Sequence, residues 1–196
     1  MSKIKRIILI ILVAVGLSSC DVLQQMSQMA TFAKCTFDFD SVNSVQMLGI
    51  NLHKGMTKSD LNVGQLLQLT NALMSKSLPV TFNVNLDINN PNATDASMTK
   101  MDYILTLNNK QVISTTMDSS ISVPANSSNV VTIPVTTDLF QLFSGESAEA
   151  ILNLAFKLAG ATSDPVNVGI KIKPYIIVGN QQLAYPDYIT MNKVLQ

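Results

Sequence analysis

An alternation of apolar and polar residues with a period of two runs through most of the chain after residue 34. It constrains the fold more than any other feature of the sequence. In the stretch 80–89, apolar Val, Phe, Leu and Ile residues alternate with Thr, Asn and Asp residues. Because successive side chains of a strand point to opposite faces, this pattern is typical of strands with one buried and one solvated face. The sequence therefore predicts a mainly β, antiparallel fold.

Further strands are predicted at 37–40, 101–107, 131–135 and 166–172 by the same period. Asn108-Asn109 follows one of them and predicts a tight hairpin, because asparagine tolerates the positive φ of such turns. Pro134 falls on the polar parity of its strand, which suits an edge or a bulge where its missing N–H breaks no ladder bond. Gly179-Asn180 predicts a turn into a last strand at 183–189.

Two stretches break this period and predict helices. In the stretch 59–76, Ser59 or Asp60 is the expected N-cap. Its apolar residues fall roughly on one helical stripe, which an amphipathic helix turns toward the core. The stripe comprises Val63, Leu66, Leu67, Leu73 and Met74.

The second predicted helix covers 145–160. Glu146 and Glu149 suit the positive first turn, Lys157 suits the negative last turn, and Gly160 is the expected stop. Additional apolar residues extend around this helix, so we expect burial on more than one side. The expected buried stripe is Ala148, Ile151, Leu152 and Ala155, extended by Leu154, Phe156 and Leu158.

Short strands separated by turn signals, with two helical insertions, favour an immunoglobulin/fibronectin-III-like antiparallel β-sandwich with helices covering its ends. We assign this single domain to residues 34–196, because the sequence shows no repeat, low-complexity tract or second-domain boundary.

The N-terminus has the pattern of an export signal. Lys3, Lys5 and Arg6 form a positive region, and the apolar run 7–17 is shorter than the ~20 residues of a spanning helix. We assign residues 1–19 to this signal. Residues 20–33 follow as a tether or a short helix.

Leu17-Ser18-Ser19-Cys20 ends the signal and resembles the bacterial lipobox. The resemblance implies that the Cys20 thiol takes a diacylglyceryl group, that cleavage occurs before it, and that the new amine is acylated. Several acyl chains give stable anchoring where one gives marginal binding. The alternative is an ordinary signal with a chance cysteine.

The predicted location is the bacterial cell envelope, anchored to a membrane by lipid. Asp21 resembles an inner-membrane retention signal of enteric bacteria, which leaves the choice of inner or outer membrane open.

Cys35 is the second of the chain's two cysteines. If Cys20 carries lipid, Cys35 has no intramolecular partner, and we expect a partly buried, inert thiol at a strand start. The alternative is a Cys20–Cys35 bridge, which would close a small loop and constrain little of the fold.

The charge balance bears on possible partners. The chain has 13 bases and 13 acids, and only 13% of its residues are charged. Nucleic-acid binding needs a surplus of clustered Lys and Arg, which is absent, so no nucleic-acid partner is expected. Without the first 19 residues the chain keeps 10 bases and 13 acids, a net of −3. Lipid, not a basic patch, is therefore the expected link to the membrane.

The sequence offers little for catalysis, and we expect no enzyme activity and no cofactor. His53 is the only histidine and lies in a polar, turn-like stretch, where we expect it at the surface. A general base needs partners within hydrogen-bond reach. A pocket that gathers Asp102, His53 and a hydroxyl would revive the enzyme hypothesis.

Metal binding is also not expected. Asp38 and Asp40 share a strand face, but they lack the oxygen-rich loop that calcium requires. Met26 and Met29 could bind a soft metal such as Cu(I), but no histidine lies nearby. The glycosylation sequons at Asn92 and Asn126 are interpreted as turn residues, because the lipobox indicates a bacterial chain.

An alternating strand that ends in Asn90-Pro91-Asn92 opens an ordered set of motifs. A strand with Tyr103, a hairpin, the tetrapeptide 122–125 (Ser-Val-Pro-Ala) and the strand 131–135 follow. This set resembles the late embryogenesis abundant type-2 family, also called the WHy domain, over about 78–174 and more loosely over 35–60. The resemblance implies a sandwich fold and a link to desiccation and stress tolerance, without an established enzymatic site. The role expected for Asn90-Pro91-Asn92 is structural. The lipobox and the helix at 145–160 depart from the plant pattern.

These observations favour a lipid-anchored, non-catalytic envelope module that binds a partner or protects against stress. The alternative is a carrier of a lipid or other apolar ligand in a groove between sheet and helix. Methionine side chains adapt to such grooves, and Met74, Met101 and Met117 could line one beside the helix at 145–160.

Overall fold

The computed structural model describes residues 31–161, 164–178 and 181–195 of the 196. Strand β1 (Thr36–Met47), β2 (Ile50–Asn51), β3 (Pro79–Asn90) and β8 (Ser127–Asp138) form one antiparallel sheet in the order β2-β1-β3-β8. β3 pairs with β8 along its whole length. Pro134 is exposed on this edge strand opposite Asn83, as its parity predicts.

The second sheet contains β5 (Lys100–Leu107), β6 (Lys110–Met117), β9 (Val166–Val178) and β10 (Gln181–Ala184) in the order β10-β9-β5-β6. β11 (Ile189–Leu195) pairs with the first part of β9, on the same side as β10. The single last strand expected at 183–189 is therefore wrong. Pro186 lies between the two strands, and proline cannot donate to a ladder. The predicted turn at Gly179-Asn180 lies outside the described residues.

The two sheets share one apolar core. The inward residues of β3 are Val80, Phe82, Val84, Leu86 and Ile88, and all are buried. Near one edge, the ammonium group of Lys193 on β11 donates to the main-chain oxygens of Phe39 and Asp40 on β1. Two shorter strands, β4 (Ala96–Met98) and β7 (Ile121–Val123), pair separately. The predicted mainly β, antiparallel fold is confirmed.

The Asn108-Asn109 hairpin between β5 and β6 is confirmed. Both asparagines have positive φ, 46° and 64°, which is the backbone that a two-residue hairpin turn needs.

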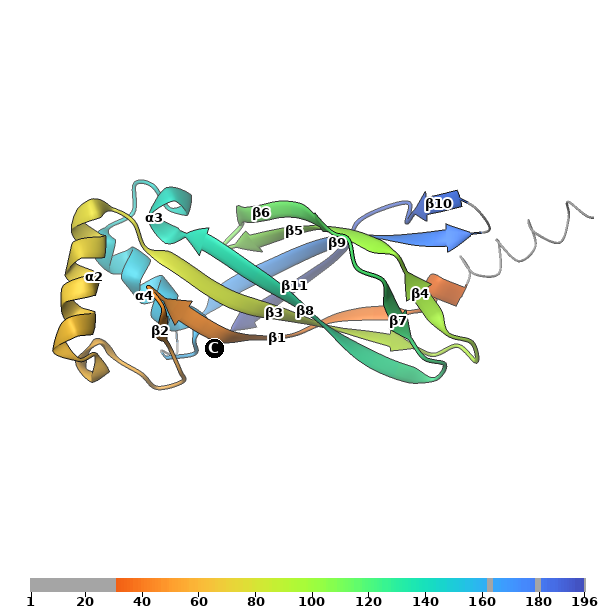
Figure 1. Cartoon of the computed structure of the whole chain (residues 1–196), viewed down its shortest axis with the longest axis horizontal. Helices are drawn as coiled ribbons and strands as arrows, with labels where there is room; N and C mark the ends of the chain where they lie inside the picture. The colour runs from red at the N-terminus through yellow and green to blue at the C-terminus, as the bar shows by residue number, and fades with distance from the viewer. Residues whose placement is uncertain (1–30, 162–163, 179–180, 196) are drawn as a thin grey trace, which may run out of the picture.

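The helices that follow β2 gather at one end of the elongated molecule, and the described chain begins with a short helical piece, 31–32, at the other end (Figure 1). They are the short 3₁₀ helix η1 (Lys58–Asp60), α2 (Val63–Ser75), α3 (Leu139–Leu142) and α4 (Ala148–Leu158). α4 starts at the N-cap Ser147, and Gly160 follows it with φ of 66°, as expected of a stop. Its predicted burial on several sides is confirmed, although Ala148 is exposed. Among the described residues, no helix is long and apolar enough to cross a membrane.

α2 differs from its prediction in two ways. Its N-cap is Asn62, which forms a capping box with Gln65, while Ser59 and Asp60 belong to η1. Its buried residues are Leu69 and Ala72. Most of the predicted apolar stripe faces solvent instead: Val63, Leu66, Leu67 and Met74 are exposed, and Leu73 is half-buried. The predicted apolar stripe exists, but most of it lies on the side of α2 that faces away from the core.

Candidate functional site

The predicted lipidation residue Cys20 lies outside the described residues, as do Met26 and Met29. The second cysteine, Cys35, is a free, buried thiol at the start of β1, as expected. Burial raises the pKa of the Cys35 thiol, which favours the less reactive protonated form.

The residues of the enzyme hypothesis do not meet in the structure. His53 is exposed and its ring contacts the oxygen of Lys54 at 3.2 Å. The Asp102 carboxylate instead accepts hydrogen bonds from Thr116 at 2.5 Å and Tyr175 at 2.6 Å. These bonds, that of Thr116 first, lower the pKa of Asp102, so its charge serves to hold neighbouring strands. In the described part of the chain, His53 therefore does not join Asp102 and a hydroxyl in one site.

Asp38 and Asp40 are both exposed, as expected of a solvated face. Asp38 lies opposite Asp87 of β3 in the strand register. Across the described part of the chain, no group of three or more His, Cys, Asp or Glu residues is arranged to hold a metal ion.

Among the described residues, the Asn90 side chain makes several hydrogen bonds at the β-rich end. It is fully buried, and its amide nitrogen donates toward the main-chain oxygens of Thr94 (2.9 Å), Val123 (3.0 Å) and Pro124 (3.1 Å). Its oxygen accepts from the backbone and side chain of Asn92 at 3.1 and 2.7 Å. The side chain thus ties the end of β3 to both sides of the β4–β7 pair. The structural role predicted for Asn90-Pro91-Asn92 agrees with this geometry.

Asn92 extends the same cluster to the beginning of the described chain. Its amide nitrogen donates to the main-chain oxygen of Thr31 at 2.8 Å, and its main-chain oxygen accepts from the backbone of Asn126 at 2.9 Å. Asn126 has φ of 51°, a turn conformation that asparagine tolerates. Both sequon asparagines therefore belong to turns.

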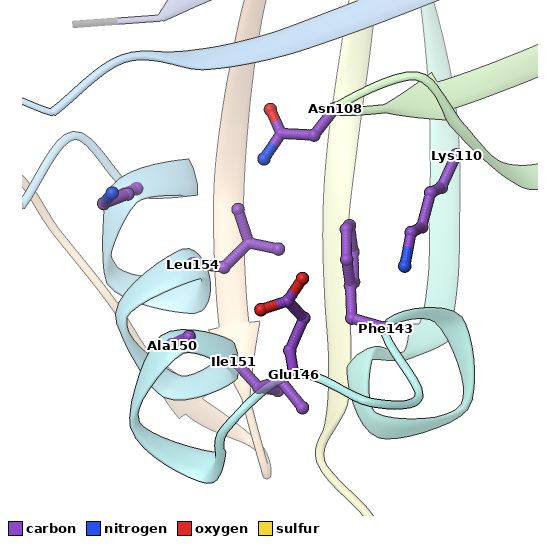
Figure 2. A pocket seen from close by; sticks show the side chains of 8 residues that line it. Asn108, Lys110, Phe143, Glu146, Ala150, Ile151 and Leu154 are labelled. Carbon is purple, nitrogen blue, oxygen red and sulfur yellow. The ribbon is translucent and has the colours of Figure 1, made fainter.

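A concave site lies at the opposite end, between α4 and the β5–β6 hairpin (Figure 2). We call it the α4 groove. It encloses about 330 Å³. Its lining comprises Asn108, Lys110, Phe143, Glu146, Ala150, Ile151, Leu154 and Lys157.

Charged groups stand around the apolar wall of the α4 groove. The Lys110 ammonium lies 4.7 Å from the centre of the Phe143 ring, and the two side chains run alongside each other (Figure 2). The Lys157 ammonium pairs with Asp164 at 3.1 Å. The Glu146 carboxylate points into the middle of the groove, between Leu154 and Phe143. Such a surface can bind a small apolar group and orient a polar one.

Two further hollows flank the helices. One of about 380 Å³ lies between α2 and the α3–α4 turn and is lined in part by Leu73, Phe140 and Phe143. Another of about 290 Å³ includes Met56 and Phe156. None of these three hollows is lined by Met74, Met101 or Met117, so the predicted methionine groove beside α4 is wrong. Met74 is exposed on α2, and Met101 is buried opposite Met117 within the second sheet.

The sequence predicts Asn108 only as a turn residue and gives no signal for Lys110 or Phe143 as residues of a site. Phe143 follows α3, a short helix that the sequence did not predict. No signal in the sequence brings residue 143 next to the hairpin at 108–110, which explains the omission.

Solved structures of several proteins align with the chain. A protein from Archaeoglobus fulgidus aligns at 12% identity and TM-score 0.35, over 79% of this chain and 96% of that one. A protein from Arabidopsis thaliana aligns at 13% identity and TM-score 0.40, over 62% and 72% of the two chains. A structure described as a late embryogenesis abundant protein aligns at 14% identity and TM-score 0.38, over 94% and 84%. No curated protein sequence matches the chain significantly.

The sequence itself matches a family model. The model of the late embryogenesis abundant protein family LEA_2 covers residues 85–182, from within β3 to within β10. The matched span holds the Asn90 cluster, the β5–β6 hairpin, α4 and β9, and amounts to half of the chain. The protein therefore belongs to the late embryogenesis abundant LEA_2 family.

Proposed function

We propose that the protein is a non-catalytic, stress-protective or binding module of the bacterial cell envelope, anchored to a membrane by lipid on Cys20. The observation that carries the proposal is the LEA_2 match over residues 85–182, because this family is linked to stress tolerance and has no established enzymatic site. The bonding of Asp102 to Thr116 and Tyr175 supports a structural use of its charge.

The anchor is supported by the N-terminal positive region, the apolar run and the sequence Leu17-Ser18-Ser19-Cys20. We expect metabolic palmitate labelling of the wild-type chain and none of Cys20→Ala. Globomycin should block maturation. An unlabelled protein that matures normally and is released, or equal labelling of Cys20→Ala, would refute the anchor.

Protection is tested separately from anchoring. A reporter enzyme is heated or dried with the purified protein, and its residual activity is compared with that of samples containing albumin at equal mass. We expect a higher residual activity with the protein. A benefit no greater than that of albumin counts against a protective role.

The α4 groove supports the second candidate function, a carrier of an apolar ligand. Its volume of about 330 Å³ is at the lower end of the range for small-molecule sites. Native mass spectrometry of protein purified without detergent would reveal a bound lipid, and uptake of a fluorescent fatty acid would give its affinity.

Ala150→Trp should fill the groove and abolish uptake. Ala33→Trp, exposed before β1, is the matched control. No bound lipid and no uptake by the wild type would refute the carrier function.

For the fold, we propose that the two main sheets form an immunoglobulin/fibronectin-III-like sandwich. The antiparallel pairings and the shared core support this class. An experimental structure tests it through the crossing angle of the sheets, expected near 30° for aligned packing.

A further inference from the structure

The two main sheets divide the charged residues of their strands by sign. Among the described residues, the strands of the first sheet (β1, β2, β3 and β8) contain no Lys or Arg, and their acids are Asp38, Asp40, Asp87 and Asp138. The described strands of the second sheet (β5, β6, β9, β10 and β11) contain Asp102 as their single acid. Their bases are Lys100, Lys110, Lys171, Lys173 and Lys193. The fold therefore gathers lysines that lie far apart in the sequence.

Three of these lysines share the outer face of the second sheet. In the β5–β9 register, Lys100 lies opposite Tyr175, and Lys173 lies opposite Asp102. Lys171 precedes Lys173 by two residues on β9, so its side chain points to the same side. The residues that alternate with them on β5 and β9 are buried. Of the two remaining lysines, one lines the α4 groove and the other binds β1.

Tyrosine and apolar side chains surround these three lysines. The Lys100 ammonium lies 4.2 Å from the centre of the Tyr175 ring, and the Lys173 ammonium lies 5.7 Å from the centre of the Tyr188 ring. Lysine and tyrosine both combine an apolar body with a polar end, which suits the boundary between water and lipid headgroups. We call this surface the lysine face, and its members are Lys100, Lys171, Lys173, Tyr175, Ile177 and Tyr188.

The acids near the lysine face do not cancel its charge. The Asp102 carboxylate accepts hydrogen bonds from Thr116 and Tyr175, and it lies close to two of the lysines. Asp187 lies in the loop before β11. Three lysines therefore stand against two acids, and one of these acids is already engaged by hydroxyl groups.

The outer face of the first sheet carries the opposite sign. Asp38 and Asp87 lie opposite each other in the β1–β3 register, and Asp40 is exposed on β1. A negatively charged bilayer attracts lysines and repels carboxylates that lie close to it. The molecule therefore has one face that suits an anionic lipid surface and one that does not.

The proposed tether permits either face to rest on a bilayer. The ring of Phe32, near the start of the described chain, lies 6.3 Å from the ring of Tyr185, which follows β10. Packed sheets are about 10 Å apart, so the two sheets with their side chains are roughly 20 Å thick. The residues between Cys20 and Thr31 reach at most about 35 Å when extended. The strands of both sheets run along the long axis, so either face can lie flat, and charge decides between them (Figure 1).

A second copy of the chain is the other candidate partner for the lysine face. The acidic face of one copy could meet the lysine face of the next, but these are two different surfaces. Such a heterologous contact repeats into a ring or an open filament. The bilayer is within reach of every anchored copy, so it is the partner that the tether favours.

We propose that the lysine face rests on the anionic lipid bilayer to which the chain is anchored, with the acidic face of the first sheet turned to water. The proposal rests on the proposed lipid anchor and deepens it, because it states which side of the molecule meets the membrane. The acyl chains supply the attachment, and the lysines supply the orientation.

The absence of tryptophan from the chain makes the orientation measurable. Ile177→Trp places a unique fluorophore on the lysine face, and Val130→Trp places one on the outer face of the first sheet, opposite Asp87. The two positions are 53% and 54% exposed, so the variants form a matched pair. Each full chain is expressed in a bacterium that processes lipoproteins, purified in detergent and reconstituted into vesicles. The vesicles contain lipid with a spin-labelled headgroup, which quenches tryptophan at the bilayer surface.

Two vesicle compositions separate the anchor from the orientation. Flotation with vesicles of phosphatidylcholine, which has no net charge, reports the anchor alone. When phosphatidylglycerol is added, we expect Ile177→Trp to be quenched several-fold more than Val130→Trp. This preference should shrink without phosphatidylglycerol and in high salt, because both conditions weaken the attraction between lysines and lipid.

Charge substitution tests the part played by the lysines. Lys171→Gln combined with Lys173→Gln, made in the Ile177→Trp chain, should remove most of the preferential quenching. Lys54→Gln combined with Lys76→Gln removes the same charge from exposed positions outside the two sheets. This matched control should leave the preference unchanged. Circular dichroism checks that both double variants keep the fold.

The outcomes distinguish the lysine face from the anchor. Flotation with equal quenching of the two tryptophan variants overturns the orientation and leaves the anchor intact. A preference that persists on phosphatidylcholine alone, or that survives the loss of Lys171 and Lys173, also overturns it. Preferential quenching on phosphatidylglycerol without flotation on phosphatidylcholine supports the lysine face and refutes the anchor. Equal quenching together with lysine-dependent association of copies in sedimentation would assign the lysine face to a second copy and overturn the proposal.

Discussion

At the scale of single residues, Asn90 shows how one side chain joins distant parts of the chain. Its amide contacts Thr94, four residues away, and Val123 and Pro124, more than thirty residues away. Asn90→Ala would leave the buried oxygen of Val123 and the partly buried oxygens of Thr94 and Pro124 without this donor. We expect a loss of about 2–4 kcal/mol in the free energy of unfolding, measured by urea denaturation. Asn89→Ala, next in the chain but exposed, should cost less than about 0.5 kcal/mol. Equal losses in the two variants would contradict this role.

The Asn-Pro-Asn sequence was sufficient to predict a structural turn, since proline fixes φ and asparagine closes turns. It could not supply the partners of Asn90. The partners are main-chain oxygens of a strand pair that depends on the whole fold, and a carbonyl oxygen has no sequence signature.

Asp87 presents the opposite case, a buried polar atom without a partner. Within the described residues, its Oδ1 has no hydrogen bond, and Asp38 faces it across the β1–β3 register. Like charges directly opposite each other destabilise a strand pair. We expect Asp87→Asn to raise the free energy of unfolding by about 0.5 kcal/mol at low salt and by less at high salt.

Urea denaturation at two salt concentrations measures the effect of Asp87→Asn. Asp118→Asn is the control, since Asp118 is exposed and belongs to no strand. A loss of stability in Asp87→Asn would contradict the repulsion and point to a favourable partner of the carboxylate.

At the scale of elements, α4 and α2 show what an apolar pattern does and does not predict. α4 is apolar on several sides, so any packing buries most of it, and its burial followed from the sequence. α2 has apolar residues on two sides. The fold has room for only one of them, the side of Leu69 and Ala72. The pattern establishes that α2 is a helix, but which side is covered depends on how the helix caps the sheets.

Asp138 joins two elements through one carboxylate. It accepts hydrogen bonds from the backbone of Leu78 before β3 (3.1 Å), from the backbone of Phe140 in α3 (2.9 Å) and from the hydroxyl of Ser77 (2.7 Å). Burial alone would raise the pKa of Asp138, but these hydrogen bonds outweigh it and lower the pKa. The stabilisation is therefore fully present above about pH 4, the pKa of an unfolded aspartate, and is lost as pH falls through the lower folded value.

Asp138→Asn tests this linkage. The amide keeps the shape but loses the charge, and we expect a loss of about 1 kcal/mol at pH 7. The difference between wild type and variant should shrink as the pH falls below about 4, because the wild-type carboxyl becomes protonated. Thermal unfolding followed at several pH values measures it. A difference that stays constant down to about pH 2 would contradict the role of charge.

At the scale of the whole molecule, the last strand closes the fold outside the matched family region. The family model ends at residue 182, whereas β11 begins at Ile189. β11 covers the edge of β9, buries Met191, and reaches β1 through Lys193. An uncovered strand edge both loses these contacts and offers unpaired backbone groups to other chains.

A chain that ends at Tyr185 should therefore unfold at a lower urea concentration, with a loss of at least about 3 kcal/mol, and should aggregate more readily. Met191→Ala keeps the strand and should cost about 2 kcal/mol, as a buried methionine truncation does. Lys193→Ala, exposed apart from its contacts with β1, should cost less than about 1 kcal/mol. A shortened chain with the same urea midpoint of unfolding as the wild type would contradict this role. β11 would then not contribute to stability, and the two sheets would be held together by the matched region and β1 alone.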